Sequence, residues 1–263
     1  MFQGRNSEAA AGFRRGAALH RAAGEHILAL LGEISVSQAL TYGGSPVEAA
    51  ERMDDLLRQA HDSGNPSAQA WAHYLAGEAA ADVDGARALA CYAAAIEHGT
   101  KADSRLFVTL ARSSSVALAA SHGPAGAALQ EFERVMEQWE DLGNEAAQWW
   151  VLLNLMILLA RVGSDRDAAL LAGAVLATRD RHPAFTRDVM RFEETLARIR
   201  DRLGRSATED AIAEGACLPY VAAVVHARSA IRTAGQATPA DGLAGRDILL
   251  QHAQSESGDS EPS

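Results

Sequence analysis

Residues 123–132, GPAGAALQEF, carry the pattern that decides the fold. A Gly is followed after four residues by a small Ala and, one helical turn later, by a large apolar residue. The pattern occurs as Gly123–Ala128–Phe132, Gly44–Ala49–Met53, Gly163–Ala168–Ala172 and, with its Gly two residues closer, Gly85–Ala88–Tyr92. The four Ala recur at spacings of 39, 40 and 40 residues, which is typical of a stacked helical array.

Each residue of this pattern has a physical role. The Gly lies between two helices and ends the first of them in the left-handed conformation. The Ala lets the neighbouring helix approach closely, and the larger residue one turn later fills the gap. We therefore expect the four Ala to be buried at contacts within helix pairs. Gly64, Gly99 and Gly143 are expected to end the second helix of three pairs.

The composition predicts an all-α protein. Ala accounts for 56 of 263 residues and aromatics for 5%, and Ala favours helices over strands. The expected pairs are 25–42 with 46–62, 67–82 with 85–98, 103–121 with 125–142, and 145–162 with 165–180. Further helices are expected over 7–23, 185–204, from a capping box at Ser206 and Glu209 to Gly215, and from Pro219 to about Arg232. The domains are then a leading helix (1–24), helix pairs (25–182), a C-terminal helical cap (183–234) and a disordered tail (235–263).

The Gly–Ala–aromatic core of each repeat resembles the tetratricopeptide repeat in a long, 40-residue form. The resemblance covers residues 25–180 and implies a right-handed superhelix of helix pairs. The usual Trp-x-x-Leu-Gly of the first helix is not kept.

The C-terminal half has a closer resemblance. It is carried by residues 149–155 (WWVLLNL), 161–163 (RVG), 168–174 (AALLAGA), 203–204, 211–215 and 218–219. These segments are similar to the C-terminal helical region of actinobacterial signalling regulators, which carry an ATPase module and often a cyclase-like or LuxR-type DNA-binding domain. The resemblance implies a non-catalytic sensor or scaffold region. It also implies a detached or truncated C-terminal part or a stand-alone relative.

Several function classes are disfavoured by the residues themselves. The single Lys, Lys101, follows Thr100, so the Gly-Lys of a P-loop is missing. The net charge of −10 argues against direct nucleic-acid binding. The nine His form no metal-binding spacing, and no nucleophile elbow is present. We therefore expect no catalytic activity, no metal and no cofactor.

The cysteines and the apolar runs predict a cytoplasmic protein. Cys91 and Cys217 lie in apolar helical contexts, and we expect both to be buried, reduced thiols. The first residues lack the apolar stretch of a signal peptide. The most apolar run, Trp149 to Ala160, is too short to cross a membrane.

The candidate partner-binding residues lie on the first helices of the pairs, which would line a concave face. They are of the types enriched at binding hot spots, and core packing is the alternative for each aromatic. The candidates are Trp71, Tyr74, Arg105, Arg112 and Trp149.

Three functions remain open at this point. The first is a non-catalytic helical-repeat interaction module of a bacterial transcriptional or signalling regulator. The second is a stand-alone adaptor that binds a protein or peptide partner in its concave groove. The third, less favoured because no cluster of ionisable residues is evident, is an all-helical enzyme acting on a small molecule.

Overall fold

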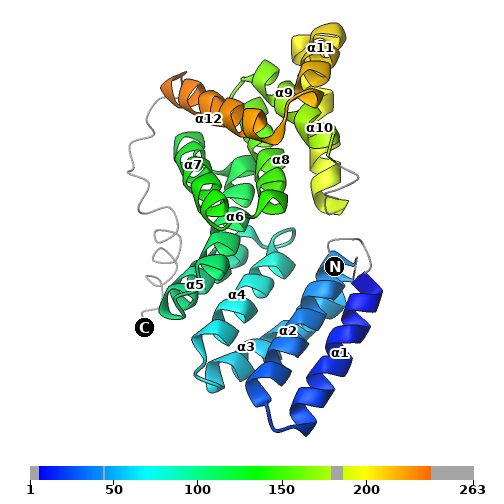
Figure 1. Ribbon diagram of the computed structural model, residues 1–263, viewed down its shortest axis with the longest axis vertical. Helices are drawn as coiled ribbons and strands as arrows, with labels where there is room; N and C mark the ends of the chain where they lie inside the picture. Colours follow the sequence, from blue (N-terminus) through cyan, green and yellow to red (C-terminus); the bar gives the residue numbers. More distant parts are fainter. Residues whose placement is uncertain (1–5, 44, 179–185, 238–263) are drawn as a thin grey trace, which may run out of the picture. The chain divides into compact units, whose positions relative to one another are not determined.

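The computed structural model describes residues 6–43, 45–178 and 186–237, and every regular element in these ranges is an α-helix (Figure 1). The all-α expectation is confirmed. The predicted disordered tail begins at residue 235, but residues 235–237 still belong to the last helix, and the remainder of the predicted tail lies outside the described residues. The helices are α1 (Asn6–Ala22), α2 (His26–Tyr42), α3 (Pro46–Asp62), α4 (Pro66–Ala80), α5 (Gly85–Lys101), α6 (Arg105–His122), α7 (Ala125–Asp141), α8 (Glu145–Arg161), α9 (Asp165–Leu176), α10 (Thr186–Leu203), α11 (Arg205–Ala216) and α12 (Tyr220–Ala237).

Side-chain caps explain where three of these helices begin. Asn65, Asp84 and Asn144 each accept a hydrogen bond from the backbone N–H three residues later, at 3.0, 2.9 and 3.1 Å. Such a bond satisfies one of the N–H groups that have no partner within the helix. The first turns of α4, α5 and α8 are therefore fixed by local sequence.

The predicted Gly stops are right at three of the described positions and wrong at three others. Gly85 is the first residue of α5, and Gly123 lies between α6 and α7 without a positive φ. Gly64, Gly143 and Gly163 end α3, α7 and α8 with φ of 62°, 64° and 86°. Gly99 lies inside α5, which continues to Lys101. A Cβ at Gly99 would lie 3.2 Å from Cγ2 of Val108 on α6, so its small size serves close helix packing instead.

The predicted capping box at the start of α11 is not formed. The helix begins at Arg205, after Gly204 with a φ of 87°, and no side chain caps it. Glu209 instead pairs with Arg200 of α10 at 3.0 Å. Arg200 thus binds the Glu209 carboxylate, which in a capping box would accept a hydrogen bond from the backbone at the start of the helix.

The chain forms two compact units, which we call unit 1 and unit 2. Their boundary lies within α6, between Ser115 and Val116. Unit 1 contains α1 to α5 and the first half of α6, and unit 2 contains the described residues from Val116 onward.

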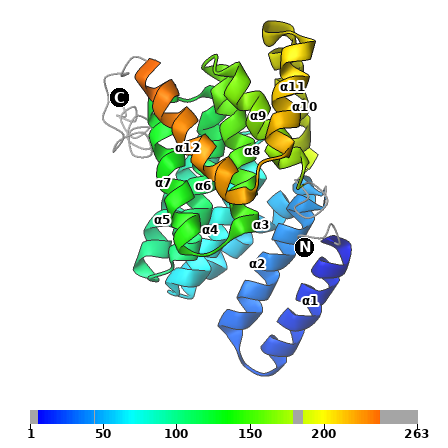
Figure 2. The same ribbon diagram turned by 45° about the horizontal axis from the view of Figure 1, so that its top comes forward.

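In unit 1 each helix packs on the next from α1 to α5, and α2 also contacts α4 (Figures 1 and 2). α2 and α4 are apolar around much of their circumference, whereas α3 and α5 are amphipathic. Ala49 and Ala88 are fully buried, as the repeat register predicts. Glycine and alanine thus allow close approach between the helices of this unit.

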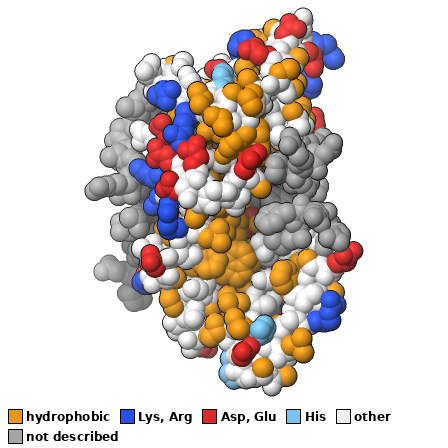
Figure 3. All heavy atoms as spheres, viewed as in Figure 1, with side chains coloured by type: hydrophobic (Ala, Val, Ile, Leu, Met, Phe, Trp, Pro, Cys, Tyr) orange, Lys and Arg blue, Asp and Glu red, His pale blue; other side chains and the backbone are white. Residues whose placement is uncertain are grey.

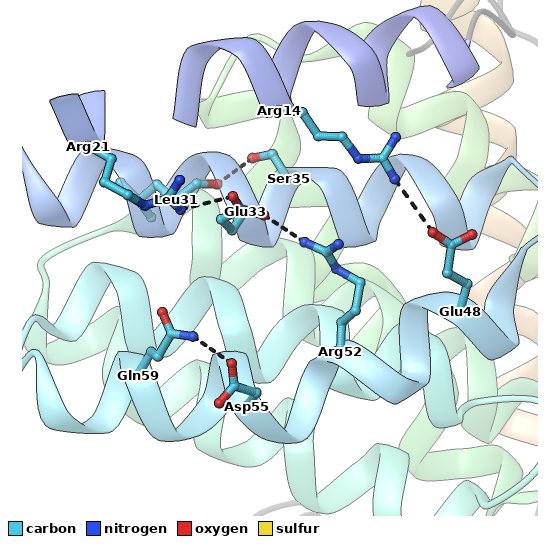
Figure 4. A network of polar contacts seen from close by, with 9 residues as sticks. All are labelled: Arg14, Arg21, Leu31, Glu33, Ser35, Glu48, Arg52, Asp55 and Gln59. Atoms are coloured by element: carbon cyan, nitrogen blue, oxygen red, sulfur yellow. Dashed lines mark hydrogen bonds and ion pairs between the residues drawn. The ribbon is translucent and has the colours of Figure 1, made fainter. Parts of the chain in front are cut away.

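Ion pairs connect the first three helices of unit 1 (Figure 4). Glu33 of α2 lies between Arg21 of α1 and Arg52 of α3, at 3.0 and 2.6 Å. Arg14 of α1 pairs with Glu48 of α3 at 3.5 Å. Because these pairs are partly exposed, each contributes about 1 kcal/mol or less to stability. The ion pairs therefore fix the relative orientation of the three helices and contribute little to the stability of unit 1.

In unit 2, α8 is the central helix and packs against α7, α9, α10 and α12. Every residue from Val151 to Ala160 is buried. Ala128 and Ala168 are buried as well, so all four Ala are buried as predicted. α9 makes a close pair with α11, and α12 contacts α7, α8 and α9.

Two arginines of unit 2, one on α8 and one on α10, donate hydrogen bonds to carbonyls at the C-terminal end of another helix. Arg161 at the end of α8 donates to the carbonyls of Ala119 and Gly123, at 3.3 and 2.7 Å. Arg202 near the end of α10 donates to the carbonyl of Ala160 on α8, at 2.6 Å. Each guanidinium adds a charged donor to carbonyls at the C-terminal end of the helix that it contacts, where Ala119 and Ala160 already accept from a backbone N–H.

Candidate functional site

A buried carboxylate surrounded by tyrosines lies in the middle of unit 1. Glu78 of α4 is 4% exposed. The hydroxyl of Tyr92 on α5 donates to its Oε1 at 2.7 Å, and that of Tyr42 on α2 donates to its Oε2 at 3.0 Å. Tyr74, one turn before Glu78, lies 3.2 Å from Tyr42, hydroxyl to hydroxyl. We call Tyr42, Tyr74, Glu78 and Tyr92 the tyrosine–glutamate cluster.

Local sequence makes room for this cluster. Tyr74 and Glu78 are four residues apart on α4 and so share one face of the helix. A Cβ at Gly77 would lie 2.5 Å from the ring of Tyr92, so a side chain at this position would displace that ring. Glu78 is the sole charged residue among the Asp, Glu, Lys and Arg types in α4. Its hydrogen bonds offset the cost of burying the charge.

The cluster makes Tyr42 a poor acid. Burial, and then the negative charge of Glu78, raise the pKa of Tyr42 well above its ordinary value. Tyr42 therefore stays neutral and remains a donor to the carboxylate over the whole physiological range.

This shift predicts a loss of stability in alkaline solution. Because the pKa of Tyr42 is higher in the folded chain, its contribution is present below the unfolded pKa of about 10 and is lost as the pH rises above it. We expect the urea midpoint of unit 1 to fall from about pH 9.5 to about pH 11.5, and to fall less in Tyr42→Phe. Equal falls in both proteins would contradict this.

An aromatic row lies beside the cluster, formed by Trp71, Tyr74 and Phe107. Trp71 stacks on Tyr74 with centroids 5.5 Å apart and planes at 14°, and it lies 5.5 Å from Phe107 of α6 at 31°. Its Nε1 lies 3.5 Å from Oγ of Ser35 on α2. Trp71 and Phe107 are half-buried, and Leu106 next to Phe107 is 45% exposed. Hydrophobic side chains gather on the face seen in Figure 3, in the area that α4 occupies in Figure 1.

The structure brings some predicted site residues together and separates others. Trp71 and Tyr74 are neighbours in the aromatic row. Arg105, exposed, and Arg112, half-buried, lie on the part of α6 that belongs to unit 1. Trp149 belongs to unit 2, where it packs edge-on against Tyr220 at 5.8 Å.

Burial decides between surface and core for two of these aromatics. Tyr74 is 5% exposed and Trp149 is 4% exposed, so the core-packing alternative holds for both. Tyr74 stacks against the buried side of the Trp71 ring and offers little surface of its own to a partner. Sequence reasoning missed Glu78, Tyr42, Tyr92 and Phe107; the signal was a lone acid, one turn after a Tyr, on an otherwise apolar helix.

A second buried polar group lies in unit 2. Asp188 of α10 is fully buried and accepts a hydrogen bond from Nε1 of Trp150 at 2.8 Å. Arg191 lies 3.9 Å from its carboxylate and donates to Oγ of Ser121 at 2.6 Å and to the carbonyl of Ala117 at 3.1 Å. These contacts join α6, α8 and α10, so their role is to cross-link helices.

Among the described residues, no group of three or more His, Cys, Asp and Glu side chains could hold a metal ion. No described helix combines the length and the apolar character needed to cross a membrane.

The two cysteines are unpaired thiols, and they differ in exposure. Burial raises the pKa of Cys91, which is half-buried. Cys217 is exposed at the end of α11, so the prediction that it is buried is wrong. Its helix ends there and leaves the side chain without a neighbouring helix face.

No family model matches the chain, and neither the curated proteins nor the solved structures contain a match.

Proposed function

We propose that the chain is a non-catalytic interaction module of a bacterial transcriptional or signalling regulator, in which tetratricopeptide-like helix pairs stack in a right-handed superhelix. Its partner is a protein or peptide, which binds on the first helices of unit 1. The observation that carries this proposal is the aromatic row, in which the half-buried rings of Trp71 and Phe107 lie on adjacent first helices.

The support beneath the row favours binding over loose surface packing. Trp71 is held by stacking on buried Tyr74 and by the contact with Ser35, so its ring is presented in one orientation. Tyr74 is in turn tied through Tyr42 to Glu78. A rigid aromatic anchor loses little entropy when a partner covers it. Arg105 lies at the start of α6 near Phe107 and adds a positive charge at the edge.

The proposal predicts which variants lose their partner. Trp71→Ala and Phe107→Ala should each weaken binding at least about tenfold, since truncated aromatic anchors typically cost more than 1 kcal/mol. The full-length protein and its variants would serve as bait for affinity capture from the native host, followed by mass spectrometry and titration with the captured partner.

Val83→Ala is the matched control, because Val83 is 86% exposed and lies in the turn between α4 and α5, away from the row. It should bind like the unaltered protein. Circular dichroism should show all variants folded. A partner that binds Trp71→Ala and Phe107→Ala as tightly as Val83→Ala would refute this surface, and a metabolite converted by the purified chain would refute the non-catalytic role.

A further inference from the structure

Two histidines face one another between α4 and α5. The rings of His73 and His98 stack with centroids 5.4 Å apart and planes at 7°. Nδ1 of each ring is buried and has no hydrogen-bond partner. Neither ring belongs to the tyrosine–glutamate cluster or to the aromatic row. Neither is part of the Gly–Ala–aromatic repeat pattern.

The geometry accommodates the pair when both rings are neutral. With the proton of each ring on Nε2, each buried Nδ1 is an unpaired acceptor, which is a modest cost. Protonation would turn each Nδ1 into a buried N–H donor without an acceptor, and it would place two like charges face to face. The charged form is therefore disfavoured at both positions.

The neighbouring charges do not compensate a second positive charge. Glu97 on α5 favours protonation of both rings, but its carboxylate holds Lys101 at 2.6 Å. Lys101 and His61 of α3 both oppose protonation of His98. Burial is the largest cause that lowers the pKa of His73, followed by the charge of His98, and burial is also the largest cause for His98.

We propose that His73 and His98 form a pH-sensitive latch between α4 and α5, closed while both imidazoles are neutral and loosened as the pH falls below about 6.5. The latch lies on the helix that carries Trp71, Tyr74 and Glu78, and on the helix that carries Tyr92. Its opening would therefore disturb the support of the aromatic row. The latch itself is defined by α4 and α5 and is independent of what binds there.

Proton linkage determines the direction in which the stability of the folded chain changes with pH. The unfolded chain binds protons at His73 and His98 near pH 6.5, whereas the folded chain binds them at these two residues at lower pH. The stabilising contribution is therefore fully present above pH 6.5 and is lost as the pH falls through the folded-state values. At pH 5.5, each histidine that stays neutral in the folded chain lowers the folding equilibrium constant on the order of tenfold.

Hydrogen exchange of the full chain tests the latch, because it reports on α4 and α5 separately from unit 2. Protection factors of the α4 and α5 amides, corrected for intrinsic rates, should fall on the order of tenfold or more from pH 7.5 to pH 5.5. The fall should shrink in His73→Gln and in His98→Gln. His26→Gln is the matched control, since His26 is exposed at the start of α2, and it should behave like the unaltered chain.

Nuclear magnetic resonance titration of the imidazole protons in the unaltered chain keeps the proposal testable even if a variant fails to fold. Both rings should titrate below pH 6.5. Rings that titrate at or above 6.5, or a fall in protection that is the same in His73→Gln as in His26→Gln, would overturn the latch.

Discussion

Gly215→Ala is expected to destabilise unit 2 by at least about 3 kcal/mol, at or beyond the upper end of ordinary overpacking. A Cβ at Gly215 would overlap the carbonyl oxygen of Leu170 on α9. A Cβ at Gly173 would in turn overlap the carbonyl oxygen of Ile212 on α11. The two helices therefore meet backbone to backbone, and each Gly receives the carbonyl side of the other helix.

The overlap with a new methyl group at this contact cannot be relieved by a small local movement. A flexible side chain can rotate away from a new methyl group, but a helical carbonyl moves only with its helix. α9 and α11 would have to separate, which would expose Leu170 and Ala211, both now buried. Gly173→Ala should therefore have an effect similar to that of Gly215→Ala.

Gly126→Ala is the matched control for both variants. Gly126 lies in α7 of unit 2, and a Cβ there would meet nothing within 4 Å. The exchange should be neutral or should stabilise by up to about 1 kcal/mol, because Ala is the better helix former. Urea unfolding followed by circular dichroism compares the three proteins. If Gly215→Ala proves as stable as Gly126→Ala, the close crossing of α9 and α11 is wrong.

The sequence allows the helices and their register to be predicted because both depend on local, periodic features. Asn65 and Asn144 each form an N-cap that a short stretch of sequence defines. Ala128 and Ala168 mark the buried face at a fixed spacing, and both are buried. The pairing of α9 with α11 has no such signature. It connects residues about 40 positions apart through Gly173 and Gly215, and a Gly within an Ala-rich helix does not reveal its neighbour.

The candidate site could be predicted only in part for a related reason. Trp71 and Tyr74 were correctly placed on one helix near one another, because their spacing of three residues is a local property. Trp149 could not be assigned to the core from its type alone, since α8 is apolar on every side and offers no polar face for comparison. The partners of Glu78 come from α2 and α5, 36 and 14 residues away in sequence, and no local pattern brings them together.

Tyr92→Phe is expected to destabilise unit 1 by about 2–3 kcal/mol, the range for hydrogen bonds to charged groups. The ring would remain in place against Gly77, so the packing of α4 on α5 is kept and the lost hydroxyl is the sole change. Oε1 of Glu78 would then lose a donor at 2.7 Å while its carboxylate remains 4% exposed. Water has little access there to replace the bond, because Tyr92 itself is 1% exposed.

Tyr42→Phe separates the loss of this bond from the general effect of removing a hydroxyl near Glu78. Tyr42 donates to the same carboxylate at the longer distance of 3.0 Å, and Tyr92 still donates to Oε1 when the hydroxyl of Tyr42 is removed. Its removal should cost about 1 kcal/mol or less at pH 7. Urea unfolding at that pH, with Trp71 fluorescence as the signal for unit 1 in a chain whose other three Trp are replaced by Phe, gives both values. Losses below about 1 kcal/mol in both variants would mean that water reaches Glu78 and that the tyrosine–glutamate cluster is not the buried support of Trp71.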